Sequence, residues 1–158
     1  MKNIYLLDTN IVSEFSKDIP NPKITEVYKI RKDLCAISAV TWQELTRGVT
    51  RLPEGRKKQY LKNCLSQIEV SFPILPYDKF ASQICGEIQA KMESKGKTLP
   101  FSDSQIAATA LSNGMVLVTH NTQDFKAIQE NSFLQMELHN LVMLGVKIRE
   151  HYIMILMD

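Results

Sequence analysis

Residues 4–10 have the sequence IYLLDTN, a short apolar run that ends at Asp8 and is followed by Thr9 and Asn10. Such a run is typical of a buried parallel strand whose carboxyl end opens into a loop. Asp8 therefore stands where the strands of an open α/β sheet present functional side chains. An aspartate that merely closes a turn would occupy the same position, so the location alone assigns no function.

Apolar runs and helical patterns alternate along the rest of the chain. Further strands are expected at residues 35–38 and 115–119. Helices are expected after Asn21, after Ser38 or Thr41, from Pro53, after Asp78 with Phe80 on the buried side, and from a capping box at Ser102 and Gln105 up to Gly114. Strands that alternate with amphipathic helices predict an α/β fold in which helices cover a parallel sheet.

The composition predicts one ordinary globular domain over residues 1–158. Of these residues 44% are hydrophobic and 23% are charged, and 19 basic against 17 acidic residues give a net charge of +2. This excess of basic residues is small for a nucleic-acid-binding protein, so any basic surface must be confined to one part of the molecule. The densest basic stretch is a solvated helix face or an RNA contact; it contains Arg47, Arg51, Arg56, Lys57, Lys58 and Lys62.

The cysteines and the two ends of the chain indicate a cytoplasmic protein. Cys35, Cys64 and Cys85 are odd in number and widely spaced, which favours reduced thiols over a disulfide framework or a zinc site. The first residues reach Asp8 too early for a signal-peptide hydrophobic region. The apolar run at 152–157 is too short to span a bilayer, so no membrane partner is expected.

Four carboxylates stand out, and each also has a structural explanation. Asp8 could close a turn, and Glu44 could complete a capping box with Thr41. Asp103 could be a first-turn acid favoured by the helix dipole, and Asp124 could cap a short helix. These carboxylates would indicate a catalytic or metal-binding site only if the fold brings them together.

Carboxylates that are gathered in one site need a cation or a proton. Two of them about 4 Å apart repel each other by roughly 4 kcal/mol at an effective dielectric near 20. Mg²⁺ or Mn²⁺ suits an all-oxygen site that also accepts substrate phosphates. Such an ion generates a nucleophile from water and stabilises the charge on a displaced phosphodiester.

Four segments of the sequence resemble, in order, the motifs of PIN-domain nucleases. They are LLDTN at 6–10, SAVTWQEL at 38–45 with Gly48 following, SDSQIAATA at 102–110 and VTHNTQDF at 118–125. The resemblance covers about residues 3–128 and is closest to VapC-type toxins. It implies a PIN-like three-layer sandwich with a mostly parallel sheet of four to five strands. Residues 129–158 are longer and more apolar than the ending expected of this family, and form an atypical C-terminal extension.

The resemblance also implies the roles of individual residues. Asp8, Glu44 and Asp103 would bind the metal, and the fourth position, which is Asp or Asn in the family, is Asn121 or Asp124. Asp124 joins the catalytic set on this basis. Support for the acids is expected from their motif neighbours Thr9, Asn10 and Thr119. His120 is expected to be a surface residue, since a metal-activated water needs no histidine base.

The function implied is that of a Mg²⁺- or Mn²⁺-dependent endoribonuclease, the toxin of a toxin–antitoxin pair. Its partners would be an RNA substrate, a cognate antitoxin protein and a second copy of the chain in a homodimer, for which the run at 152–157 offers apolar surface. One alternative is a catalytically weak PIN-fold module that binds its antitoxin in DNA-bound autoregulation. A phosphatase with an aspartate nucleophile is disfavoured, because Asp8-Thr9-Asn10 lacks a second aspartate.

Overall fold

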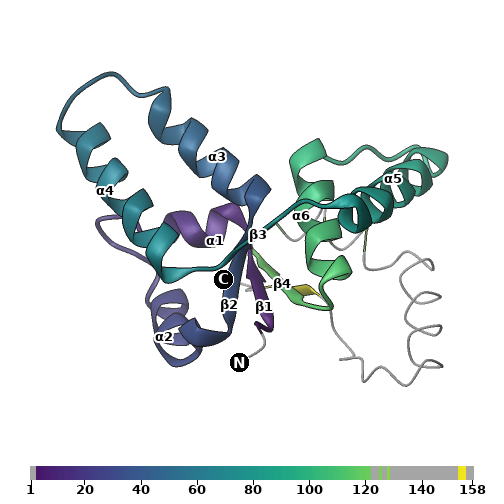
Figure 1. Ribbon diagram of the computed structural model, residues 1–158, viewed down its shortest axis with the longest axis horizontal. Coiled ribbons are helices and arrows are strands. Elements are labelled where there is room, and N and C mark those ends of the chain that lie inside the picture. Colours follow the sequence, from purple (N-terminus) through teal and green to yellow (C-terminus); the bar gives the residue numbers. More distant parts are fainter. Residues whose placement is uncertain (1–2, 122–124, 126–127, 129–152, 156–158) are drawn as a thin grey trace.

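The fold is built on a parallel sheet of five strands (Figure 1). The computed structural model describes residues 3–121, 125, 128 and 153–155. The strand order is β3-β2-β1-β4-β5, and every neighbouring pair is parallel. The strands are β1 (Tyr5–Leu7), β2 (Cys35–Ser38), β3 (Ile74–Leu75), β4 (Val116–Thr119) and β5 (Ile153–Ile155). Because all five run the same way, their carboxyl ends share one edge of the sheet.

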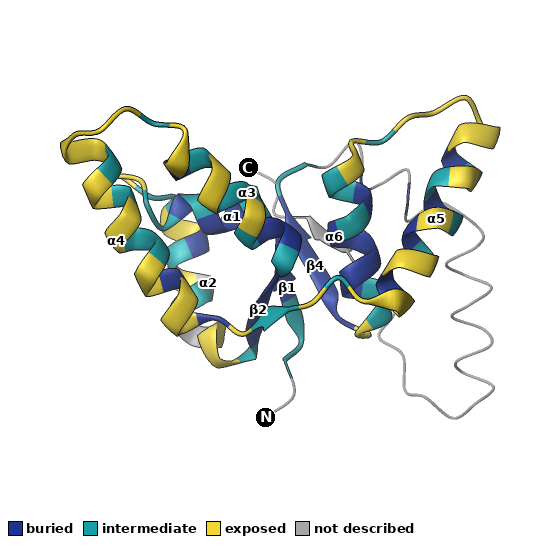
Figure 2. Ribbon diagram, turned by 45° about the horizontal axis from the view of Figure 1, so that its top comes forward, coloured by how far each residue is buried: buried dark blue, intermediate teal, exposed yellow. Residues whose placement is uncertain are grey.

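Six α-helices and one short 3-10 helix connect these strands within the described residues. They are α1 (Thr9–Glu14), α2 (Pro22–Arg31), η1 (Lys32–Leu34), α3 (Ala39–Thr50), α4 (Arg56–Ser71), α5 (Lys79–Ser94) and α6 (Phe101–Ser112). Helices α1 to α4 lie to one side and α5 and α6 to the other (Figures 1 and 2). The predicted α/β sandwich of three layers is confirmed.

The two faces of the sheet bury alternate residues of the central strands. Leu6 pairs with Ala36 and Leu117, and all three belong to the core beneath α5 and α6. The next register row, made by Leu7, Ile37 and Val118, belongs to the core beneath α1, α2 and α4. This alternation with a period of two is what a strand that is covered on both faces requires.

Three predicted helix starts are confirmed by their caps. The side chains of Asn21, Ser38 and Asp78 accept hydrogen bonds from the backbone N–H groups of Lys23 (3.0 Å), Thr41 (2.9 Å) and Ala81 (2.9 Å). Each cap satisfies a donor that the first helical turn leaves without a partner.

Three local predictions are wrong. The helix predicted from Pro53 begins at Arg56, and Ser102 lies inside α6, which begins at Phe101. Pro100 is the N-cap residue of α6. It has non-helical backbone angles and makes no side-chain hydrogen bond to the helix. Phe80, expected on the buried stripe of α5, is 71% exposed.

The C-terminal apolar run has a place in the sheet. Residues Ile153–Ile155 form β5 and pair with Leu117–Thr119 of β4. The described part of this run therefore packs within the chain, which counts against its predicted role as a dimer surface. All three cysteines are free thiols, as predicted. Among the described residues, no helix is both long and apolar enough to cross a bilayer.

Candidate metal centre

Asp8 follows β1 at the carboxyl edge of the sheet and is also the N-cap residue of α1. Its side chain is 4% exposed. The carboxylate accepts hydrogen bonds from the backbone N–H of Thr9 (2.7 Å), from Nδ2 of Asn10 (2.7 Å) and from Oγ1 of Thr119 (2.6 Å). These neutral donors fix the orientation of the carboxylate but leave its charge in place.

The pKa of Asp8 is raised above its ordinary value of 3.8. Burial is the largest cause, and the negative charge of Glu44 raises the pKa further. The hydrogen bonds from Thr119, Thr9 and Asn10 act in the opposite direction without restoring the ordinary value. Asp8 is therefore a carboxylate whose ionised form would be stabilised by a nearby cation.

Glu44 reaches the same edge from the second turn of α3. Its Oε2 accepts a hydrogen bond from Oγ1 of Thr9, which links it to the residue beside Asp8. The capping-box explanation of Glu44 is wrong, because Ser38 caps α3 and Thr41 is already inside the helix. No Lys or Arg among the described residues forms an ion pair with Asp8 or Glu44.

Asp103 approaches from the first turn of α6 and is joined to the loop after β4. Its Oδ2 accepts a hydrogen bond from Nδ2 of Asn121 (3.0 Å). The backbone N–H of Asn121 donates to Oγ1 of Thr119 (2.9 Å), and that hydroxyl donates to Asp8. One hydroxyl group thus connects the Asp8 side of the site with the Asp103 side.

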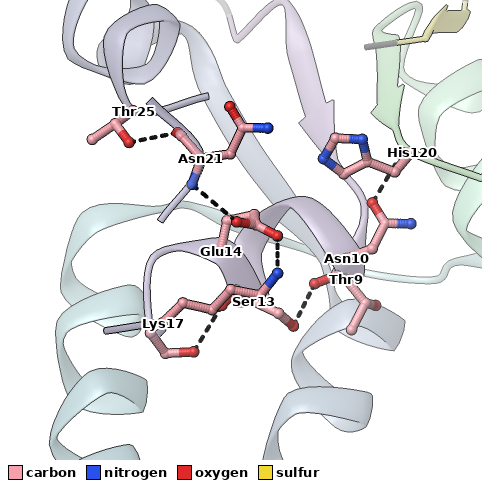
Figure 3. Close-up of polar contacts among 9 residues, drawn as sticks. Thr9, Asn10, Ser13, Glu14, Lys17, Asn21, Thr25 and His120 are labelled. Atoms are coloured by element: carbon pink, nitrogen blue, oxygen red, sulfur yellow. Dashed lines mark hydrogen bonds and ion pairs between the residues drawn. The ribbon is translucent and has the colours of Figure 1, made fainter. Parts of the chain in front are cut away.

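Asn10 ties α1 to the end of β4 (Figure 3). Its Oδ1 accepts a hydrogen bond from the backbone N–H of His120 (3.1 Å), and its Nδ2 contacts Oγ1 of Thr119 (3.2 Å) as well as Asp8. Thr9, Asn10 and Thr119, the expected supporting residues, all lie against the acids. Asp124 lies outside the described residues.

Glu14 is a second buried carboxylate of α1, and the sequence reasoning missed it. It is 8% exposed, forms an ion pair with Lys17 and accepts a hydrogen bond from the backbone N–H of Asn21 (3.2 Å; Figure 3). The hydrogen bond from Lys17 is the largest cause of a lowered pKa at Glu14, and the charge of His120 contributes least. The three-residue spacing of Glu14 and Lys17 was the available signal. This pair holds the connection to α2.

The donor chemistry of the site fits a hard divalent cation. Asp8, Glu44, Asp103 and the amide of Asn121 offer oxygen ligands, which Mg²⁺ and Mn²⁺ prefer. In the part of the chain that the structure describes, no three His, Cys, Asp or Glu side chains form one close metal-binding group. The carboxylates are instead arranged as Asp8 with Glu44, and Asp103 with Asn121, on the two sides of Thr119.

Comparison with known proteins gives matches over most of the chain. The PIN domain model matches residues 5–131. Toxin FitB of Neisseria gonorrhoeae is 34% identical over 127 residues, covering 77% of this chain and 91% of that protein. The tRNA(fMet)-specific endonuclease VapC of Shigella flexneri is 32% identical over 126 residues, covering 78% and 91%.

Solved structures agree with the sequence matches. The crystal structure of FitAcB from Neisseria gonorrhoeae has a TM-score of 0.73 at 33% identity and covers 80% of this chain and 94% of that chain. DNA-bound VapBC from Salmonella typhimurium gives a TM-score of 0.71 at 27% identity, covering 78% and 91%. The fold is therefore shared with these proteins over about four fifths of this chain.

Proposed function

This chain belongs to the PIN-domain family, and on that premise we propose that it is a metal-dependent endoribonuclease and the toxin of a toxin–antitoxin pair. Its similarity to ribonuclease toxins extends over about three quarters of its length. The observation that carries the proposal is the buried carboxylate of Asp8, which has a raised pKa and lies beside Glu44 at the carboxyl edge of the sheet.

Asp8, Glu44 and Asp103 would hold Mg²⁺ or Mn²⁺, with Asn121 or Asp124 completing the set. When bound, the ion supplies a nucleophile from water at neutral pH and offsets the charge that develops on the phosphodiester. The chain's own part is positioning. Thr119 and Asn10 hold Oδ2 of Asp8, and Thr9 holds both Asp8 and Glu44. Because these donors are neutral, the site keeps the negative charge that a cation requires.

A protein antitoxin is the proposed partner, and inhibition would act on the same carboxylates. FitAcB and VapBC are among the structures that resemble this chain, and the VapBC structures from Salmonella typhimurium and Rickettsia felis are bound to DNA. An arginine of the antitoxin could satisfy Asp8 and Glu44 in place of the cation, because its planar guanidinium pairs bidentately with carboxylates. The DNA-bound relatives also favour a second role, in which the chain and its antitoxin bind operator DNA together.

We also propose that the protein works in the cytoplasm as a homodimer. The free cysteines agree with a reducing compartment. Phe80 and Phe101 lie at the beginnings of α5 and α6 and are 71% and 64% exposed, so both side chains are accessible to a second copy. A monomer in light scattering at micromolar concentration would contradict the dimer.

The test of the enzymatic proposal compares two buried carboxylates of the same region. Wild-type protein, Asp8→Asn and Glu14→Gln are incubated with total RNA in Mg²⁺, Mn²⁺ or EDTA, and fragments are counted by gel electrophoresis. We expect cleavage by the wild type and by Glu14→Gln in either ion, none in EDTA, and at least a hundredfold loss in Asp8→Asn.

Circular dichroism shows whether each variant folds. Full cleavage in EDTA, or cleavage by a folded Asp8→Asn protein at the wild-type rate, would overturn the proposal. Metal-dependent RNA cleavage by the wild-type protein would exclude the catalytically weak binding module as the main function.

A further inference from the structure

We propose that the face of α3 that carries Glu44 continues outward as a track for the RNA backbone, made by Arg47, Gly48 and Arg51. The inference rests on the proposed ribonuclease function and names the surface that guides the substrate to the carboxylates. It concerns residues outside the acid site that the motifs did not assign to RNA.

The helical register places these residues in one row. Positions 44, 47, 48 and 51 are separated by three, four and seven residues, the spacing that repeats on one face of an α-helix. Arg51 is the C-cap residue of α3 and still has helical backbone angles. At 1.5 Å per residue, Arg47 lies about 4.5 Å and Arg51 about 10.5 Å beyond Glu44 along the helix axis.

Both arginines are available for a polyanion. They are exposed, and neither forms an ion pair with a described residue, Glu44 included. Residues 45–62 contain six basic side chains and one acid, whereas the whole chain has a net charge of +2, so the remainder of the chain is net negative. The single acid, Glu54, is already paired with Lys58 at 2.6 Å. Positive charge is therefore concentrated on the arm formed by α3 and α4, whose outer part is largely exposed (Figure 2).

Gly48 supplies a second and independent observation. It lies inside α3 and does not have a positive φ, and a Cβ added there would meet nothing within 4 Å. Neither a turn nor internal packing requires glycine at this position, although glycine weakens a helix interior relative to alanine. A bare backbone between two arginines lets a ligand approach the helix closely.

The charges along the row favour RNA over an acidic protein segment. At its inner end, the row reaches Glu44 and Asp8, which would repel an acidic peptide. A nucleic acid would match both ends, because a cation held by the carboxylates would neutralise one phosphate and the arginines would contact those that follow. Arginine also pairs bidentately with phosphate.

Affinity for RNA in the absence of cleavage tests the arginines. Binding of a fluorescent single-stranded RNA oligonucleotide is measured by anisotropy in EDTA, at several salt concentrations, for wild type, Arg47→Ala, Arg51→Ala and Lys29→Ala. Lys29 is the charge-matched control: it is exposed in the last turn of α2, which leads to the opposite edge of the sheet. We expect a several-fold loss and a salt slope lower by about 0.7 for each arginine variant, and no change for Lys29→Ala.

Gly86 provides the matched control for Gly48. It is also inside a helix, α5, where an added Cβ would meet nothing within 4 Å. Gly48→Leu should weaken RNA binding and cleavage several-fold, whereas Gly86→Leu should leave both unchanged. Thermal melting of all variants establishes that they are folded.

Three results would overturn the track. They are unchanged RNA affinity in both arginine variants, an equal loss in Lys29→Ala, and wild-type binding by Gly48→Leu. If Arg47→Ala and Arg51→Ala bound a polyglutamate probe more weakly than the wild type but bound RNA equally well, the arginines would serve an acidic protein partner instead. Cleavage of RNA by the wild type with any of these outcomes leaves the proposed function intact. Absence of cleavage in every divalent ion would refute that function, whatever the arginines bind.

Discussion

Replacing Asp8 with Asn should change stability far more in the presence of a divalent cation than in its absence. Burial raises the pKa of Asp8, so ionisation of this group disfavours the folded state, and each pKa unit corresponds to 1.36 kcal/mol. The substitution removes that charge. It also replaces Oδ2, which accepts hydrogen bonds from Asn10 and Thr119, with a donor. Each lost bond costs about 0.5–1.5 kcal/mol, so at pH 7 without metal this loss and the relief of the buried charge oppose each other.

The difference in free energy of unfolding between wild type and Asp8→Asn should depend on pH. Well below pH 3.8 the carboxyl is neutral in both the folded and the unfolded state, and the variant is destabilised only by its lost hydrogen bonds. As pH rises through the raised pKa of folded Asp8, the wild type loses stability relative to Asp8→Asn. The difference in free energy of unfolding should therefore shift in favour of the variant between acid and neutral pH, as measured by urea denaturation in EDTA. A constant difference across that range would refute the raised pKa.

Addition of metal should favour the wild type over Asp8→Asn. An ion at a hundred times its Kd stabilises the folded state by about 2.7 kcal/mol. For a domain of this size, 1 kcal/mol corresponds to about 2–4 °C, so the Tm of the wild type should rise by roughly 5–11 °C. The Tm of Asp8→Asn should rise by less than half as much. Differential scanning calorimetry with MgCl₂ or MnCl₂, against NaCl at equal ionic strength, measures both. Equal shifts in the two proteins would refute Asp8 as a metal ligand.

Three further perturbations have defined outcomes. Glu14 has a lowered pKa, so its stabilisation is present above pH 4.5 and is lost as pH falls through its folded pKa; urea denaturation of Glu14→Gln should show a weaker loss of stability in acid. Thr119→Val removes the donor to Asp8 and the acceptor for Asn121; its free energy of unfolding should fall by about 1–3 kcal/mol and its RNA cleavage rate should drop. Gly86→Ala should raise the free energy of unfolding by about 0.5–1 kcal/mol in chemical denaturation, with cleavage unchanged.

Local signals predicted the local parts of this structure well. The apolar run before Asp8 marked the central strand, and Asn21 and Asp78 marked helix starts through caps that need no distant partner. The sequence signals failed where a helix begins without a side-chain cap. Pro100 starts α6 through its backbone, so the side-chain pattern at Ser102 was misleading.

The candidate site was predictable in its residues but not in its connections. The motifs named Asp8, Glu44 and Asp103, yet no spacing could show that Thr9 would donate to a glutamate 35 residues away. Nor could spacing show that the hydroxyl of Thr119 would join two carboxylates from different elements. These contacts depend on how strands pair across the sheet, which is a property of the whole fold.

The central position of β1 has a consequence for the order in which the molecule is made. Its two neighbours are β2, which follows soon after it, and β4, which carries Thr119. The bond between Thr119 and Asp8 spans 111 residues. At about 5–20 residues per second, a ribosome needs roughly 6–22 s to add that stretch. A nascent chain that stops before β4 can pair β1 with β2, but it leaves the other edge of β1 open and Asp8 without its hydroxyl partner. The candidate site is therefore incomplete in such a chain, because it also lacks the contact of Asn121 with Asp103.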